Sequence, residues 1–435
     1  MWGGFTHGWA PELYENEGLR NHGDHSLTIG GNGVQFHRDD VGSEQSKGSG
    51  AMDFSFTAEQ EAIRDTARKF AADQLAPAYK AREEALSLDR DVVVEMGALG
   101  FIAGDSPEEY GGFGLDSVTI GIIIEELSQG DLNAAYVQVL GSLIAQVIAA
   151  HASKAAAQEW IPKIVAGEAL AALALTEPGG GSDAANLRLR AEADGAGGYI
   201  LNGEKTSISL ADQADVAVVF ARTGGEGARG VSAFLTPLNV AGISRTRFDD
   251  LGSGAVGRGS LFFDSVRVPA DMMLGDEGGG FRQVMQGFDY SRALIGLQCL
   301  GAARASMDET WAHVTEREAF SRPLAQFQGV SFPLAEAEAR YKATRLVCFE
   351  TLWRRDEGLT HTSEAAMSKW MGPKTAVDIL HDCLLLNGHM GYAKDLPHQQ
   401  RLRDVIGLEI GDGTAQIMKM IIAREKAGRV TVQHG

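Results

Sequence analysis

The spacing of apolar residues changes twice along this 435-residue chain, and the order of these changes restricts its fold more than any other feature. Apolar residues recur at helical spacing from residue 57 to about 165, and helical spacing returns after residue 278. Between them lie short β-branched or aromatic runs bounded by Gly, Pro and Asp. The sequence shows neither an internal repeat nor a strand–helix alternation, which argues against a Rossmann nucleotide domain. It predicts an α+β, mostly α fold.

The first helix is predicted to begin at Thr57, because Thr57 and Gln60 have the spacing of a capping box, and to end near Pro77. Further N-terminal helices are predicted over residues 89–99, 117–129, 131–150 and 153–165. Strands are predicted over residues 216–220, 231–235 and 261–268, and Asn202-Gly203 is typical of a hairpin turn.

These patterns divide the chain into four segments. Residues 1–51 are rich in Gly, His and Asn without apolar periodicity, so we interpret them as a disordered tail or a leader added for expression, with Met52 as the natural start. Residues 52–167 are predicted to form a helical domain, residues 168–278 a β domain and residues 279–435 a second helical domain.

Composition restricts the partners. A formal net charge of −19 argues against nucleic acid, because binding to its phosphates requires clustered Lys and Arg. Cys299, Cys348 and Cys383 are widely spaced in apolar helical contexts, which predicts buried thiols in a reducing compartment. No apolar run approaches the ~20 residues of a membrane span, and no secretion signal is evident. We expect a cytoplasmic protein without membrane insertion.

Two glycine-rich stretches carry the chemistry. Residues 411–417 (GDGTAQI) place Asp412 between two glycines just before a helix, where the backbone can approach a ligand closely. Residues 175–183 (LTEPGGGSD) are rich in N–H groups and small side chains that can cradle a large polar cofactor. Taken alone, the second stretch could equally be a surface turn.

With these stretches, the sequence resembles the acyl-CoA dehydrogenase family along residues 52–428. The resemblance rests on separated motifs in the family's order, which cover residues 176–183, 202–205, 266–269, 288–292, 317–320, 391–392, 403–404 and 413–416. It implies a middle β-barrel or sandwich, a C-terminal four-helix bundle and FAD as the cofactor.

The resemblance also implies which residues bind FAD. Leu173, Leu175 and Thr176 would contact the flavin, while Gly181 and Ser182 line the path between flavin and thioester. Arg317 and Phe320 would contact the adenosine-diphosphate half of an FAD held by a neighbouring subunit, which implies a homo-oligomer, usually a tetramer. The complete predicted set is Leu173, Leu175, Thr176, Gly181, Ser182, Ser207, Ser209, Arg317, Phe320, Gln328, His389, Thr414 and Gln416.

Substrate contacts follow from the same resemblance. Asp289 and Arg292 match a family pair beside the pantetheine arm of CoA, although an ordinary helix-surface ion pair at i, i+3 spacing is the alternative. The predicted substrate-binding residues are Ser182, Asp289, Arg292, Gly411 and Gly413.

Asp412 stands at the position of the family's catalytic base, which removes the α proton of the thioester while flavin N5 takes the β hydride. The alternative is that Asp412 merely caps the following helix. A helix N-terminus would lower the pKa of Asp412 and burial would raise it, and the sequence leaves that balance open.

Two departures from the family pattern bear on the substrate. Relatives commonly carry Glu at the position of Asp412 and a bulky aromatic at that of Gly411, and both changes make room around the α carbon. Asp at this position resembles the alicyclic enzymes. The sequence therefore predicts oxidation of cyclohexanecarboxyl-CoA to cyclohex-1-ene-1-carboxyl-CoA.

Other readings remain open. They are a short- or branched-chain acyl-CoA dehydrogenase, and 1,4-dehydrogenation of cyclohex-1-ene-1-carboxyl-CoA, which needs a second acid that residues 132–150 do not supply. A flavin monooxygenase or oxidase and a non-enzymatic acyl-CoA-binding scaffold are the remaining alternatives. Ser291, at the position where another branch of the family has its base, cannot act as one.

Further departures concern electron transfer and cofactor contacts. Many relatives have Trp at the position of Ser207 and Thr at that of Ser209, which leaves one flavin edge less covered where an electron-transferring flavoprotein would accept electrons. Leu385 replaces a frequent Gln near the adenine side. His381, His389 and His398 fit no common ligand spacing, so no metal site is predicted.

Overall fold

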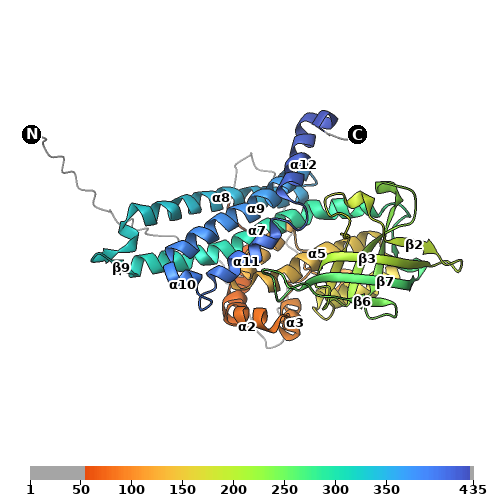
Figure 1. Ribbon diagram of the computed structural model, residues 1–435, viewed down its shortest axis with the longest axis horizontal. Coiled ribbons are helices and arrows are strands. Elements are labelled where there is room, and N and C mark those ends of the chain that lie inside the picture. Colours follow the sequence, from red (N-terminus) through yellow and green to blue (C-terminus); the bar gives the residue numbers. More distant parts are fainter. Residues whose placement is uncertain (1–53, 432–435) are drawn as a thin grey trace, which may run out of the picture. The chain divides into compact units, whose positions relative to one another are not determined.

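The computed structural model describes residues 54–431, so the predicted leader and its boundary at Met52 lie outside the described residues. The described chain has the predicted organisation, with helices before and after a β domain (Figure 1). The helices are α1 Ala58–Phe70, α2 Tyr79–Ala85, α3 Arg90–Ala98, α4 Ser117–Gly130, α5 Leu132–His151, α6 Lys154–Val165, α7 Gly280–Glu316, α8 Gln328–Asp356, α9 Thr362–Leu386, α10 Gly388–Tyr392, α11 His398–Leu408 and α12 Ala415–Ala427.

Helices α3 to α6 match the predicted boundaries within about two residues, whereas α2 was not predicted. Thr57 and Gln60 form the reciprocal capping box at the start of α1, and a short π-helical segment, Ala71–Leu75, continues that helix toward Pro77. Helix α5 is long and apolar enough to cross a membrane by length and composition, but 83% of that stretch is buried. It is a core helix that packs against α4, α6 and α7.

The β domain is one eight-stranded sheet with the path β6-β7-β3-β2-β4-β5-β8, and β1 pairs in parallel with β4. Its strands are β1 Ala171–Ala174, β2 Arg190–Ala193, β3 Tyr199–Ser209, β4 Val216–Arg222, β5 Val231–Pro237, β6 Ile243–Arg245, β7 Arg258–Val268 and β8 Met273–Leu274. The short edge strands β9 Glu318–Ala319 and β10 Arg322–Pro323 form a separate hairpin.

The predicted hairpin turn at Asn202-Gly203 is wrong. Both residues lie inside β3, where a register shift against β7 accommodates them, and Gly203 has a φ of 139°. The Asn202 side chain accepts a hydrogen bond from the Ser265 N–H at 2.8 Å. The turn that joins β2 to β3 is instead closed by Asp194, which accepts the N–H of Gly198 at 2.8 Å. The Asn-Gly pair is compatible with a β-bulge as well as with a hairpin turn, and the local sequence does not distinguish the two.

The C-terminal bundle packs α7 against both α8 and α9, and Figure 1 shows these long helices side by side with the sheet at one end. The thiols of Cys299, Cys348 and Cys383 lie in these three helices and are buried, as predicted.

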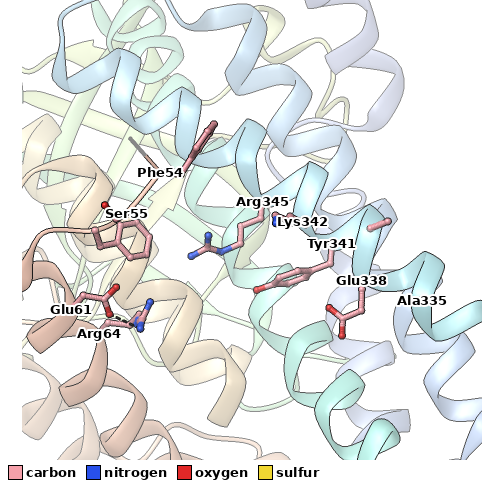
Figure 2. A pocket seen from close by; sticks show the side chains of 11 residues that line it. Phe54, Ser55, Glu61, Arg64, Ala335, Glu338, Tyr341, Lys342 and Arg345 are labelled. Atoms are coloured by element: carbon pink, nitrogen blue, oxygen red, sulfur yellow. Dashed lines mark ion pairs between the residues drawn. The ribbon is translucent and has the colours of Figure 1, made fainter. Parts of the chain in front are cut away.

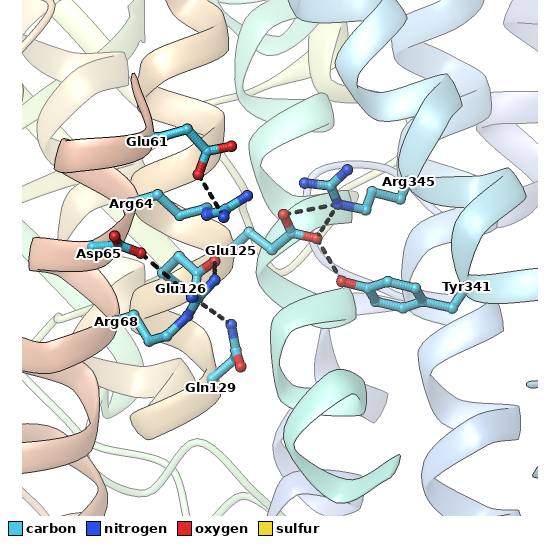
Figure 3. A network of polar contacts seen from close by, with 9 residues as sticks. All are labelled: Glu61, Arg64, Asp65, Arg68, Glu125, Glu126, Gln129, Tyr341 and Arg345. Carbon is cyan, nitrogen blue, oxygen red and sulfur yellow. Dashed lines mark hydrogen bonds and ion pairs between the residues drawn. The ribbon is translucent and has the colours of Figure 1, made fainter. Parts of the chain in front are cut away.

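A buried polar network joins the N-terminal helices to this bundle (Figure 3). Glu125 of α4 accepts hydrogen bonds from the Tyr341 hydroxyl at 2.6 Å and from Arg345 Nε at 2.7 Å, both on α8. Its neighbour Glu126 pairs with Arg68 of α1 at 2.9 Å. Because these carboxylates are buried, the paired cations hold α1, α4 and α8 in one arrangement.

Another buried carboxylate, Asp404 on α11, fixes the helix that leads to Asp412. It accepts hydrogen bonds from Tyr79 at 2.6 Å, from Asn133 at 2.8 Å and from the Ser253 N–H at 2.5 Å. Burial raises the pKa of Asp404 to about 6, against the lowering effect of these donors. The contacts tie α11 to α2, α5 and a loop of the β domain.

Candidate active site

Asp412 lies in the loop of residues 409–414 between α11, which ends at Leu408, and α12. Asp412 has a φ of 54° and Gly413 a φ of 107°, so the backbone is in the left-handed region at both positions. Thr414 is the N-cap of α12, and its hydroxyl accepts the Ile417 N–H at 3.4 Å. The alternative reading of Asp412 as the helix cap is therefore wrong.

The charge of Asp412 depends on its burial and on two cations. Burial raises its pKa and is the largest influence, while the positive charges of Lys369 and Arg292 lower the pKa. Burial therefore outweighs the two cations, and the pKa of Asp412 is raised. Within residues 54–431, no protein group donates a hydrogen bond to this carboxylate. It is a partly buried acid whose oxygens are not engaged by the surrounding protein.

Lys369, on α9, was not predicted as a site residue. Its side chain is 2% exposed, and its Nζ donates to the carbonyl oxygens of Leu408 at 2.7 Å and Gly413 at 3.1 Å. The two acceptors stand at the two ends of the Asp412 loop. The sequence does carry one signal for Lys369. It is a lysine on the same apolar face of α9 as Ala365, Ala366 and Ala376, where a charge is costly unless it is paired.

Arg292 and Asp289, predicted to bind substrate, lie on α7 and form an ion pair of 2.9 Å at i, i+3 spacing. The pair is not on the surface, since Arg292 is buried and its Nε has no hydrogen-bond partner among the described residues. Thr362 donates to the second carboxylate oxygen of Asp289 at 2.7 Å. A buried guanidinium with an unused donor, close to Asp412, suits a polar ligand atom.

Tyr136 of α5 connects Asp412 to the predicted flavin residues. Burial raises the pKa of Tyr136, the nearby negative charge of Asp412 raises it further, and a hydrogen bond with Ser209 lowers it. Ser209 of β3 and Asp412 are therefore brought to the same buried tyrosine, although 203 positions separate them in the sequence (412 − 209). Tyr136 was not predicted as a site residue, because an aromatic residue in an apolar helix is typical of a core residue.

The predicted flavin loop begins where β1 ends, and a buried ion pair holds it. Lys205 Nζ contacts Glu177 at 2.8 Å and the Leu175 carbonyl at 3.0 Å, and Glu177 also accepts the Leu189 N–H at 2.8 Å. Burial lowers the pKa of Lys205 to about 8, while Glu177 opposes that shift. The Thr206 N–H donates to the Thr176 carbonyl at 2.9 Å, so residues 173–176 and 206–209 lie side by side.

These two segments present unused hydrogen-bonding groups. Ser207 is exposed at a φ of 55°, beside a bulge in β3. Within the part of the chain that the structure describes, no protein group bonds to the hydroxyls of Thr176, Ser182 or Ser207. Gly181 and Ser182 are exposed, Leu173 is half-buried and Leu175 is buried. This donor set fits a flat polar ring that lies against both segments.

The remaining predicted cofactor residues lie elsewhere. Arg317, Phe320 and Gln328 surround the β9–β10 hairpin, which Figure 1 shows at the end of the bundle remote from the sheet. Phe320 is 90% exposed with a φ of 54°. His389 on α10 and Gln416 on α12 are also exposed, and Thr414 caps α12. One chain does not bring Arg317, Phe320 or Gln328 to Thr176.

Neither of two surface cavities includes a predicted site residue. One, of about 700 Å³, lies between α1 and α8 and is lined by Arg64, Tyr341, Arg345 and residues around them (Figure 2). The other, of about 420 Å³, lies between α3 and α6.

No group of three metal-ligating side chains occurs among residues 54–431. His398 is buried, and burial lowers its pKa to about 4.

Comparison with known proteins places these features in a family. Three family models match consecutive parts of the chain: the N-terminal domain of acyl-CoA dehydrogenases over residues 57–168, the middle domain over 172–266 and the C-terminal domain over 278–427. The short-chain specific acyl-CoA dehydrogenase of Bos taurus is 34% identical over 364 residues, which cover 83% of this chain and 88% of the relative.

Solved structures are similar over the same span. Butyryl-CoA dehydrogenase from Megasphaera elsdenii is 30% identical with a TM-score of 0.83, covering 86% of this chain and 100% of that one. A glutaryl-CoA dehydrogenase from Mycobacterium smegmatis in complex with FADH2 is 27% identical with a TM-score of 0.81, covering 86% of this chain and 95% of the other.

Proposed function

The chain belongs to the acyl-CoA dehydrogenase family, and we propose that it oxidises cyclohexanecarboxyl-CoA to cyclohex-1-ene-1-carboxyl-CoA with FAD as cofactor and Asp412 as base. The coarser activity, dehydrogenation of an acyl-CoA thioester, follows from the family. The alicyclic substrate and the residue roles are the proposal.

The observation that carries the proposal is the environment of Asp412. Its carboxylate is partly buried, lies near two cations and accepts no hydrogen bond from the described protein. Lys369 and Arg292 oppose the effect of burial and favour the ionised form that a base requires. A carboxylate in this state can take the α proton of a thioester, and the C–H electron pair then forms the new Cα–Cβ double bond as a hydride leaves Cβ.

FAD fits the residues present. Bound flavin would supply the acceptor for the β hydride. Thr176, Ser207 and Ser209 would hold its ring, because their segments are adjacent and two of the three hydroxyls have no protein partner in the described chain. Ser209 forms a hydrogen bond with Tyr136, and the negative charge of Asp412 acts on the same tyrosine. The flavin ring and the base would therefore face the same space.

The ring-shaped substrate is supported by the room at Gly411. A Cβ built on Gly411 would meet only the Gly407 carbonyl oxygen, at 3.8 Å, and no side chain within 4 Å. The family's bulky aromatic at this position would occupy that open space. Gly411 and the short Asp412 side chain would therefore leave more room beside the base than an aromatic residue and a glutamate would.

Gly411→Tyr is expected to convert the substrate preference. The tyrosine ring should exclude a cyclohexane ring and leave a four-carbon chain in place, so kcat/KM for cyclohexanecarboxyl-CoA should fall at least about 10-fold, the size of a steric effect of 1–3 kcal/mol. Steady-state kinetics with both thioesters measures the ratio. Gly225→Tyr is the matched control, because a Cβ there meets nothing within 4 Å on an exposed loop.

Butyryl-CoA is the decisive competitor, since the similar proteins include a short-chain specific acyl-CoA dehydrogenase and a butyryl-CoA dehydrogenase. Single-turnover bleaching of the flavin with straight, branched and alicyclic thioesters should be fastest with the cyclohexane ring. Fast bleaching by butyryl-CoA with little bleaching by the alicyclic thioester would instead establish the short-chain function.

The proposal includes oligomerisation and a partner. Arg317, Phe320 and Gln328 are exposed at the far end of the bundle, so we infer that they contact FAD held by a neighbouring copy in a homotetramer, and that a cytoplasmic electron-transferring flavoprotein accepts the electrons. The guanidinium of Arg317 would pair with the pyrophosphate.

Arg317→Ala is therefore expected to lower the FAD content of the purified protein without changing its helical content. The loss of one charge-assisted contact should weaken FAD binding about 10-fold or more. Flavin absorbance per chain across a dilution series measures it, with Arg190→Ala, an exposed arginine of the β domain, as control. Unchanged FAD retention on dilution would remove Arg317 from the cofactor site.

A further inference from the structure

We propose that Lys369 is a positioning residue that clamps the two ends of the Asp412 loop together and holds the base beside the substrate. This inference rests on the proposed function for its catalytic meaning, but the clamp itself is a property of the polypeptide. The Lys369 ammonium group donates hydrogen bonds to the Leu408 carbonyl, at 2.7 Å, and to the Gly413 carbonyl, at 3.1 Å.

The loop needs such a clamp for two reasons. Asp412 is held in the left-handed region at a φ of 54°, a conformation that is strained for a residue with a side chain. The Leu408 carbonyl lies at the C-terminal end of α11, where the last carbonyls lack partners within the helix. A buried cation satisfies that carbonyl, offsets the partial negative charge of the helix end and fixes the loop geometry.

The clamp is buried and costly to keep charged. Lys369 is 2% exposed, and burial lowers its pKa, whereas the negative charge of Asp412 raises that pKa. Three hydrophobic residues of α9, Ala365, Ala366 and Ala376, share its buried face. An apolar residue would pack here without that cost, so the charge at this position has a use beyond filling space.

The charged and titratable groups that act on this pair, or on Arg292 beside it, lie on α5, α7 and α12 and in the loop. Lys369 and Asp412 face each other, Arg292 of α7 acts on both, and Cys299 of α7 and Glu409 of the loop act on Lys369. Tyr136 of α5 senses Asp412, and Asp289 of α7 and Arg424 of α12 act on Arg292. Of these groups, only Lys369 contacts both ends of the loop through hydrogen bonds in the described chain.

Two substitutions separate the hydrogen bonds from the charge. Lys369→Met removes both, and Lys369→Gln keeps an amide donor for one carbonyl without the charge. Flavin bleaching by the thioester requires ionised Asp412, so its rate rises with pH along a limb set by the pKa of that group. Loss of the Lys369 charge raises that pKa, and the limb should move to higher pH in both variants.

The rate at the plateau should also fall, by roughly 10- to 100-fold in Lys369→Met, because a base displaced by about 1 Å loses that much. Hydrogen exchange of the substrate-free proteins gives a readout independent of catalysis. Amides of residues 409–414 should exchange faster in Lys369→Met than in wild type, with Lys369→Gln between them. Lys163→Met, at an exposed lysine on α6, is the matched control.

The outcomes are distinct. Faster loop exchange together with a shifted limb supports the clamp, and an unshifted limb with wild-type loop exchange in folded, FAD-containing variants overturns it. A merely structural role for Lys369 would lower the melting temperature without moving the pH limb, which also contradicts the inference. Failure of wild type to bleach with any thioester refutes the proposed function, and loop exchange alone then decides the clamp.

Discussion

Asp412→Asn is expected to abolish dehydrogenation while the purified protein remains yellow with bound FAD. The amide has nearly the shape of the carboxylate but cannot take a proton, and general-base catalysis contributes about 10²- to 10⁴-fold. The loop should keep its fold, because Lys369 binds the backbone carbonyls of Leu408 and Gly413 and not the Asp412 side chain. Turnover with an artificial acceptor and the flavin content per chain measure the two halves of this expectation.

Asp412→Glu is the matched control for that substitution. It retains a carboxylate with one more methylene, so it should keep part of the activity and lose most with the bulkiest thioester. If Asp412→Asn turned over at the wild-type rate, another group would be the base and the proposed mechanism would be wrong.

Glu177→Ala is expected to be the most destabilising of the proposed substitutions and to release FAD. It leaves the buried Lys205 ammonium without its counter-charge and frees the Arg188 and Leu189 N–H groups that Glu177 binds. Breaking one partner of a buried pair costs about 3–5 kcal/mol. The same pair holds the segment at Leu175 against the segment at Thr206. The temperature of thermal unfolding and the flavin content should therefore fall together.

A double variant and a surface pair test the cause. Glu177→Gln with Lys205→Met removes both charges and should recover part of the stability, because no uncompensated charge is then buried. Glu159→Ala breaks an exposed pair with Lys163 on α6 and should cost about 0–1 kcal/mol. Equal losses in the buried and exposed pairs would show that burial of Lys205 is not what makes Glu177 matter.

Local patterns were enough for the start of α1, for helices α3 to α6 and for three of the eight strands of the sheet, β4, β5 and β7. The capping box at Thr57, the apolar spacing of α4 to α6 and the β-branched runs of β4, β5 and β7 each depend on residues close in sequence. Asn202-Gly203 shows the limit of that reasoning. Whether it turns or bulges is decided by its partner strand β7, which begins at Arg258, far along the chain.

The candidate site divides in the same way. Asp412 was predictable because its glycine neighbours and family motif are local. Lys369 was not predictable, because the carbonyls that it binds are 39 and 44 residues away in the sequence. The residues next to Lys369 give no indication of these contacts. Tyr136 was hidden among the apolar residues of α5, and only the folded structure shows that it lies between Ser209 and Asp412.

The central claim is that the Asp412 carboxylate removes the α proton beside bound FAD. Anaerobic single-turnover bleaching with cyclohexanecarboxyl-CoA that carries deuterium at the α carbon tests it most directly. The account predicts that deuterium slows bleaching in wild type and that Asp412→Asn bleaches at least about 10²-fold more slowly with either isotope. Bleaching that is insensitive both to the α deuterium and to the loss of this carboxylate would contradict it.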